Sequence, residues 1–111
     1  MSETSATTYH FVAASESFLT VEEPLEEVLR ERVRYYQEQG KTIDFWLVRQ
    51  PAFLEAPELA SLAARVPRPA AAVVSTDGHF ITFLKLRLEF VATGQFSAPS
   101  GSIADPLANL G

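Results

Sequence analysis

Cysteine is absent from this sequence. Disulfide frameworks, thiolate metal sites and thiol nucleophiles are therefore excluded, and the composition fits a reducing compartment. Glycine is also sparse. The five glycines stand far apart in the sequence, so they form no phosphate-binding cradle. No apolar run approaches the roughly 20 residues that a membrane-spanning helix needs. We therefore expect neither nucleotide chemistry nor a membrane span.

Basic residues and histidines are few as well. Nine lysines and arginines stand against fourteen acids, so the formal net charge is -5. A phosphate backbone would be repelled, and we predict no nucleic-acid partner. The two histidines, His10 and His79, have no second histidine or carboxylate at metal-ligand spacing, and the Glu-x-x-His motif is missing. We predict no metal, no cofactor and no catalytic residue in this chain.

The domain organisation follows from length and composition. The chain has 111 residues and nearly half of them are apolar, which is enough for one modest core. Residues 1–8 are rich in serine and threonine, resemble neither a secretory signal nor a transit peptide, and are predicted to be disordered. Residues 9–94 form the predicted α/β domain. Residues 95–111 are predicted to be an irregular tail that packs on the domain.

Apolar spacing and turn residues predict most of the elements. Short β-prone runs at residues 9–14 and 18–21 are predicted to pair as a hairpin. Pro24 and Gly40 bracket a segment with apolar residues at helical spacing, which predicts a helix. Residues 43–48 are predicted to be a central or near-central strand with both faces covered. A short helix opening at Pro57 and a strand at residues 70–75 follow.

The element after residue 76 is ambiguous in its local pattern. Residues 84–90 alternate between apolar and polar side chains, which taken alone indicates a strand. Asp77 can cap a helix and Gly94 can end one, and the span between them suits a helix of about four turns. We therefore predict a helix. Its polar residues fall on one narrow stripe, comprising Gly78, Thr82, Lys85, Glu89 and Thr93.

Two arginines stand on apolar sides of their predicted helices. Arg87 lies within the apolar arc of the last helix and is expected to face inward, and Arg32 repeats the anomaly on the first helix. Such a guanidinium must meet a carboxylate or carbonyls, reach an edge, or lie on an exposed apolar patch. An internal ion pair and an interface anchor both remain open. With Asp44 as the expected companion of Arg87, the candidate partner-binding residues are Asp44, Phe45, Arg87, Trp46 and Arg32.

Longer stretches of the sequence resemble a known family. The segments PLEEVLRERVRYYQEQGKTIDFWLV, VVSTDGHFITFLKLRLEFVATGQFSAPS and DPLANL are similar to the small accessory protein of the magnesium-protoporphyrin IX monomethyl ester oxidative cyclase. The resemblance covers nearly the whole chain from about residue 9 to residue 110. It implies an α+β domain of two or three layers, in which a largely antiparallel sheet of three or four strands packs with helices.

The resemblance also implies a function and a place. Members of that family occur in cyanobacteria and plastids, and they support the membrane-associated cyclase that forms the fifth ring of chlorophyll. The di-iron chemistry belongs to a different subunit, so we expect a non-catalytic accessory or assembly subunit whose partner is that catalytic subunit. We expect a cyanobacterial cytoplasm, with thylakoid association through the partner, or a plastid stroma. Oligomeric state stays open.

A tetrapyrrole carrier is the alternative hypothesis. In that role the aromatic rings of Trp46, Phe45 and residues 80–90 would stack on a flat macrocycle, and an arginine would hold a propionate.

Overall fold

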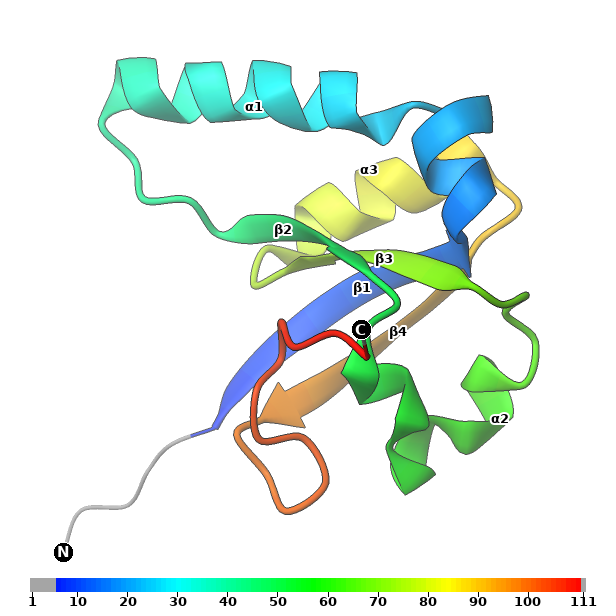
Figure 1. Ribbon diagram of the computed structural model, residues 1–111. Coiled ribbons are helices and arrows are strands. Elements are labelled where there is room, and N and C mark those ends of the chain that lie inside the picture. The colour runs from blue at the N-terminus through cyan, green and yellow to red at the C-terminus, as the bar shows by residue number, and fades with distance from the viewer. Residues whose placement is uncertain (1–5, 111) are drawn as a thin grey trace, which may run out of the picture.

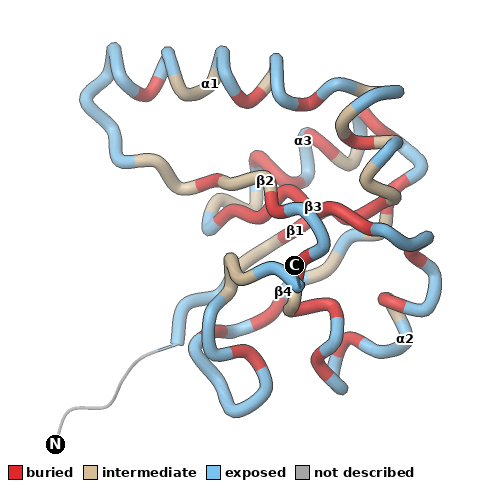
Figure 2. Tube along the Cα trace, in the orientation of Figure 1, coloured by how far each residue is buried: buried red, intermediate tan, exposed pale blue. Residues whose placement is uncertain are grey.

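Four antiparallel strands form the middle layer of the protein in the computed structural model, which describes residues 6–110. The strands lie in the order β2-β3-β1-β4 (Figure 1). The two inner strands are dense in small and β-branched apolar residues because both of their faces are covered (Figure 2). The strand bounds are β1 Thr7–Ser15, β2 Phe45–Arg49, β3 Ala70–Ser75 and β4 Ala92–Ala98.

Two helices cover one face of the sheet, α1 (Leu25–Gln39) and α3 (Gly78–Leu88) (Figure 1). Helix α1 begins after Pro24 and ends at Gly40, whose φ of 68° is the left-handed conformation that glycine adopts without steric cost. Beneath the helices lies an apolar core made by Val12, Ala14, Leu19, Leu25, Leu29, Tyr36, Phe45, Ala71, Val73, Phe80, Ile81, Leu84, Leu88 and Val91.

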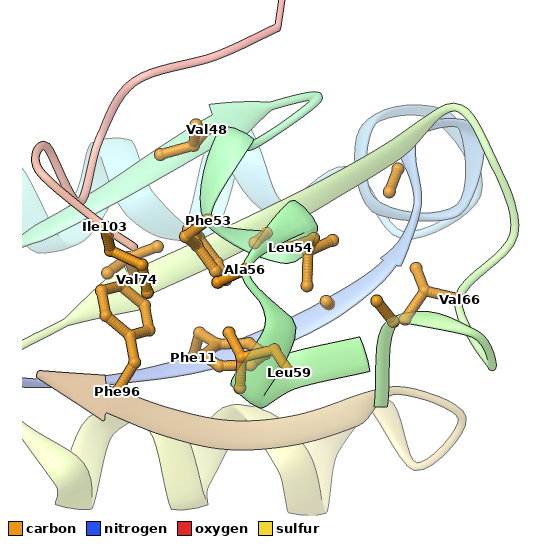
Figure 3. Close-up of a cluster of buried hydrophobic side chains, with 14 of the residues drawn as sticks. Phe11, Val48, Phe53, Leu54, Ala56, Leu59, Val66, Val74, Phe96 and Ile103 are labelled. Carbon is orange, nitrogen blue, oxygen red and sulfur yellow. The ribbon is translucent and has the colours of Figure 1, made fainter. Parts of the chain in front are cut away.

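Short helical turns and the C-terminal segment cover the opposite face (Figure 1). The turns are η2 (Ala52–Glu55), η3 (Pro57–Leu59) and α2 (Ala60–Ala63). The C-terminal segment is held to them where Ser102 Oγ donates to the Glu58 carboxylate and where Ile103 is buried. Figure 3 shows the aromatic and aliphatic side chains of this second core, with Phe11 from β1 and Phe96 from β4 meeting Phe53.

The structure confirms the α+β class and several predicted elements. The first long helix, the short helix opening at Pro57 and the strand at residues 70–75 lie where the sequence places them. Strand β2 is instead an edge strand, so its prediction as a central or near-central strand is wrong. Its residues are apolar because α1 covers one face and the C-terminal segment covers the other, even though one edge has no neighbouring strand.

The predicted hairpin between residues 9–14 and 18–21 is also wrong. Residues Phe18–Glu22 form η1, a short π-helix, in which Leu19 is buried. The two edges of β1 are taken by β3 and β4, with Val12 opposite both Val73 and Thr93. No edge of β1 therefore remains for a hairpin partner.

The ends of the predicted domain need correction as well. Residues 1–5 of the segment predicted to be disordered lie outside the described residues, whereas Thr7 and Thr8 already belong to β1. At the other end, β4 continues from Ala92 through Gly94 to Ala98, inside the segment predicted to be an irregular tail. Strand pairing with β1 decides both boundaries, because Thr7 lies opposite Ala98.

Candidate functional site

Helix α3 is fixed at both ends by side chains. Asp77 caps its N-terminus, where the Oδ1 atom accepts from the backbone nitrogens of His79 at 3.0 Å and Phe80 at 3.4 Å. At its C-terminus Glu89 has a φ of 64°, and Lys85 Nζ donates to the carbonyl oxygen of Glu89 at 3.1 Å. The capping role predicted for Asp77 is confirmed. The predicted end at Gly94 is wrong, because the chain turns at Glu89 and enters β4.

The outward side of α3 carries large apolar side chains. Phe80, Ile81, Leu84 and Leu88 are buried against the sheet, whereas Phe83 is 53% exposed and Leu86 is 74% exposed. Just beyond the helix, Phe90 is 83% exposed. At about 100° per residue Phe83, Leu86 and Arg87 fall on one arc of the helix, whereas Phe90 follows the turn at Glu89, where the helical rotation no longer applies. We define the α3 outer face as Phe83, Leu86, Arg87 and Phe90.

Arg87 points to solvent, so the prediction that it faces inward is wrong. The sheet takes the arc around Leu84, and the remaining apolar residues of α3 are left outside with Arg87. Its guanidinium forms no ion pair or hydrogen bond with any of the residues 6–110. Of the three environments expected for such an arginine, it occupies the exposed apolar patch.

Arg32 instead forms an internal ion pair. Its Nη2 atom lies 3.2 Å from Asp77 Oδ2 and donates to Tyr36 Oη at 3.0 Å. The guanidinium packs against three aromatic rings and lies closest to Phe80, with its Cζ atom 3.8 Å from the ring centroid. Of the two possibilities that the sequence left open, the structure therefore shows the internal pair for Arg32.

Asp44 joins this same group rather than Arg87. The hydroxyl of Tyr36 donates to Asp44 Oδ1 at 3.0 Å, and Ser75 Oγ donates to the Asp44 carbonyl oxygen at 2.7 Å. Burial raises the pKa of Tyr36, and the hydrogen bond to the Asp44 carboxylate raises it further, while the charge of Arg32 lowers it. The expected companionship of Asp44 and Arg87 is not found.

Phe45 and Trp46 lie on opposite faces of β2. Phe45 is 3% exposed and meets Tyr36 edge-on at a centroid distance of 5.2 Å. Trp46 is half-buried and packs against the core on the other side of the sheet. The five predicted site residues therefore separate into three groups, namely the partly buried network with Arg32, Asp44 and Phe45, the α3 outer face with Arg87, and Trp46 on the far side.

Sequence reasoning missed several residues of these groups. The outward apolar face of α3 was not predicted, although Phe83 and Leu86 stand three positions apart, which is the spacing of one helix face. Asp77 was recognised only as a cap, and its second role as the partner of Arg32 has no local signal because 45 positions separate the two residues.

Residues 6–110 contain neither a cluster of metal-binding side chains nor a membrane-spanning helix. No group of three or more histidine, aspartate or glutamate side chains there is arranged to hold a metal ion. None of the helices in that range is long and apolar enough to cross a bilayer.

Comparison with known proteins gives consistent matches over nearly the whole chain. A family model described as "Ycf54 protein" matches residues 7–98. A Ycf54-like protein from Synechocystis is 58% identical over 103 residues, which cover 93% of this chain and 77% of that protein. A protein from Arabidopsis thaliana, named as the chloroplastic protein YCF54, is 46% identical over 96 residues, covering 86% of this chain and 44% of that one.

Solved structures agree with the fold. The Ycf54 protein from Synechocystis superposes with a TM-score of 0.94 at 55% identity, covering 96% of this chain and 100% of that one. A protein from Nostoc gives the same TM-score of 0.94 at 62% identity, with 97% and 100% coverage. The sheet order and both helical layers described above are thus shared with experimental structures.

Proposed function

Because this chain belongs to the Ycf54 family, we propose that it is a non-catalytic accessory subunit of the magnesium-protoporphyrin IX monomethyl ester oxidative cyclase. In this role it supports the assembly, stability or activity of the membrane-associated catalytic subunit, which carries the di-iron centre and forms the fifth ring of chlorophyll. The chain reaches the thylakoid surface through that partner. The family relationship and one surface of the molecule support the proposal.

The single observation that carries it is the α3 outer face. Two large apolar side chains of α3, Phe83 at 53% and Leu86 at 74% exposure, lie on the same arc as Arg87, and Phe90, 83% exposed, follows just beyond the end of the helix. Apolar side chains gathered in this way on an otherwise charged protein are typical of binding surfaces. Aromatic residues and arginine are also the residue types that contribute most to binding energy at protein interfaces.

The chemistry of this face indicates what the partner must present. An apolar surface is needed to cover Phe83, Leu86 and Phe90, and an acceptor is needed for the guanidinium of Arg87. A carboxylate fits best, because it accepts two parallel hydrogen bonds from arginine in a geometry that fixes orientation. The cyclase subunit is thus expected to offer an apolar strip that contains one aspartate or glutamate.

Binding to the purified catalytic subunit tests this proposal. Phe83→Ala and Arg87→Ala should each weaken binding by about 2 kcal/mol, or roughly thirtyfold, as expected for residues at an interface centre. Both side chains are exposed, so circular dichroism and melting temperature should stay near those of the unchanged protein.

Two matched controls are available on other parts of the surface. Leu110→Ala removes an apolar side chain that is also 53% exposed but lies near the C-terminus, and Arg30→Ala removes an exposed arginine of α1. Neither should change binding. Equal binding by all four variants would refute the α3 outer face as the docking surface.

A second experiment addresses the non-catalytic role. The purified chain, incubated with the magnesium-protoporphyrin ester, a reductant and oxygen, should form no fifth-ring product, whereas adding the catalytic subunit should allow product to form. Product formation by the chain alone would overturn the proposal.

A further inference from the structure

A closed loop of polar contacts ties α3 to α1 and to the start of β2. Asp77 holds two groups with one carboxylate, since Oδ1 caps α3 and Oδ2 accepts from Arg32 at 3.2 Å. Arg32 also donates to Tyr36 Oη, and Tyr36 donates to Asp44. The loop closes through Ser75, whose Oγ donates to the Asp44 carbonyl at 2.7 Å and accepts from the Asp77 backbone nitrogen at 2.9 Å.

This loop continues into the α3 outer face through stacked side chains. The Arg32 guanidinium lies over the ring of Phe80, and Phe80 stacks on Phe83 with a centroid distance of 6.5 Å and an interplanar angle of 18°. Phe83 belongs to the α3 outer face. The Arg32–Asp77 pair is thus connected both to this ring, through Phe80, and to the cap of α3.

We propose that Arg32 and Asp77 are positioning residues for partner binding. They hold the first turn of α3 so that the α3 outer face is preformed before the partner arrives, and they act without contacting the partner. The proposal rests on the proposed function of that face. A surface that is already ordered loses less conformational entropy on binding, so its affinity is higher for the same contacts.

The fold does not depend on this pair alone. Both apolar cores consist of side chains from the sheet and its covering elements, and the central residues of β1 and β3 are fully buried. Loss of the pair is therefore expected to loosen the start of α3 while the sheet stays intact. This separation makes a positioning role measurable.

The variants are chosen to separate the cap from the ion pair. Asp77→Asn keeps an oxygen that can accept from His79 and Phe80 but removes the charge that Arg32 meets, and asparagine is as good a cap as aspartate. Asp77→Ala removes both functions. Arg32→Met keeps an apolar stem over Phe80 without the charge, and Arg32→Lys keeps the charge without the planar group.

Two quantities are measured for each variant, namely affinity for the purified catalytic subunit and amide hydrogen exchange along α3 in the free chain. Arg32→Met and Asp77→Asn should each weaken binding about tenfold, because the free energy that the pair contributes to ordering α3 would then have to be supplied on binding. Exchange at the first turn of α3 should accelerate, while exchange in β1 and β3 should not change. Arg32→Lys should recover part of the affinity.

The double variant Arg32→Met/Phe83→Ala separates positioning from direct contact. A residue that acts through α3 gives less than additive losses once Phe83 is gone, whereas a residue that touches the partner itself gives additive losses. Additive losses would overturn the proposal. So would unchanged binding by Arg32→Met and Asp77→Asn despite faster exchange in α3.

Failure of this inference can be told apart from failure of the proposed function. If Phe83→Ala and Arg87→Ala bind poorly while the Arg32 and Asp77 variants bind normally, the docking face stands and only the positioning role falls. If Phe83→Ala and Arg87→Ala bind normally, the docking face itself falls. Should Arg32→Met fail to fold, Asp77→Asn supplies the same comparison with the cap preserved.

Discussion

The Cζ atom of Arg32 lies 3.8 Å from the centroid of the Phe80 ring, so a charge on α1 is stacked on an aromatic ring of α3. The same guanidinium pairs with Asp77, at the cap of α3. The cation–π contact with Phe80 and the ion pair with Asp77 thus both hold the first turn of α3. Through Arg32, both contacts link the two helices that cover one face of the sheet.

The stacking should be measurable as a coupling energy. Replacing Arg32 by Met, Phe80 by Leu, and both together forms a double-mutant cycle in which each change keeps most of the apolar volume. We expect a coupling of about 1 kcal/mol in the free energy of unfolding, because a partly buried cation over a ring is worth about that much. Urea unfolding supplies the four values. A coupling near zero would show that the contact adds no stability.

Tyr36 predicts a loss of stability at high pH. Burial raises the pKa of its hydroxyl above the ordinary value of 10.0. In the unfolded chain the hydroxyl ionises at about pH 10, whereas in the folded chain it still holds its proton at that pH. Its contribution to stability is therefore fully present below about pH 10 and is lost as the pH rises through the folded pKa.

Tyr36→Phe is the comparison for this effect. Both proteins are unfolded in urea between about pH 9 and pH 11. As the pH rises over this range, the unchanged protein should lose stability relative to Tyr36→Phe. A difference that stays constant over the range would contradict the assigned environment of Tyr36.

Gly94 should not tolerate a side chain. A Cβ atom at this position would lie 2.9 Å from Leu62 Cδ1 and 3.0 Å from Phe11 Cζ. Gly94→Ala is therefore expected to lower the free energy of unfolding by about 1–3 kcal/mol, as other overpacked cores do. Gly101→Ala is the matched control, because nothing lies within 4 Å of a Cβ atom there.

Relief of the clash provides a further check. Adding Leu62→Val to Gly94→Ala removes the nearest atom and should recover part of the lost stability. If Gly94→Ala melts at the same temperature as the unchanged protein, β4 does not pack closely against Leu62.

Trp46 tests the alternative role as a tetrapyrrole carrier. A macrocycle stacked between Trp46 and the rings of α3 would have to contact both faces of the sheet, because Trp46 and Phe80 belong to different cores. We therefore expect no saturable quenching of Trp46 fluorescence when magnesium-protoporphyrin ester is added at micromolar concentration. Saturable quenching at this concentration would favour the carrier.

Local sequence patterns predicted those elements whose signals lie within the element. The long helix between Pro24 and Gly40 has apolar residues at helical spacing and residues suited to both of its ends. The strand at residues 70–75 consists of small and β-branched residues, and all six are buried. Asp77 was identified as a cap because capping needs only its own side chain and the next turn.

Elements that depend on distant neighbours were predicted less well. Residues 18–21 have strand-like composition, but both edges of β1 were already occupied, so they coil into η1. Residues 92–98 were divided between a helix and a tail because their partners in β1 lie about 80 to 90 positions away in the sequence. The strand order that made β2 an edge strand also has no local signal.

The sequence alone determined that this protein has no thiol chemistry, that its first long helix lies between Pro24 and Gly40, and that two arginines stand among apolar helix residues. Only the tertiary structure decided where those arginines point. Helix α3 is apolar around most of its circumference, so helical spacing cannot select the arc that meets the sheet. Packing buried the arc around Leu84 and left Arg87 outside, while Asp77, distant in sequence, came close enough to hold Arg32 inside.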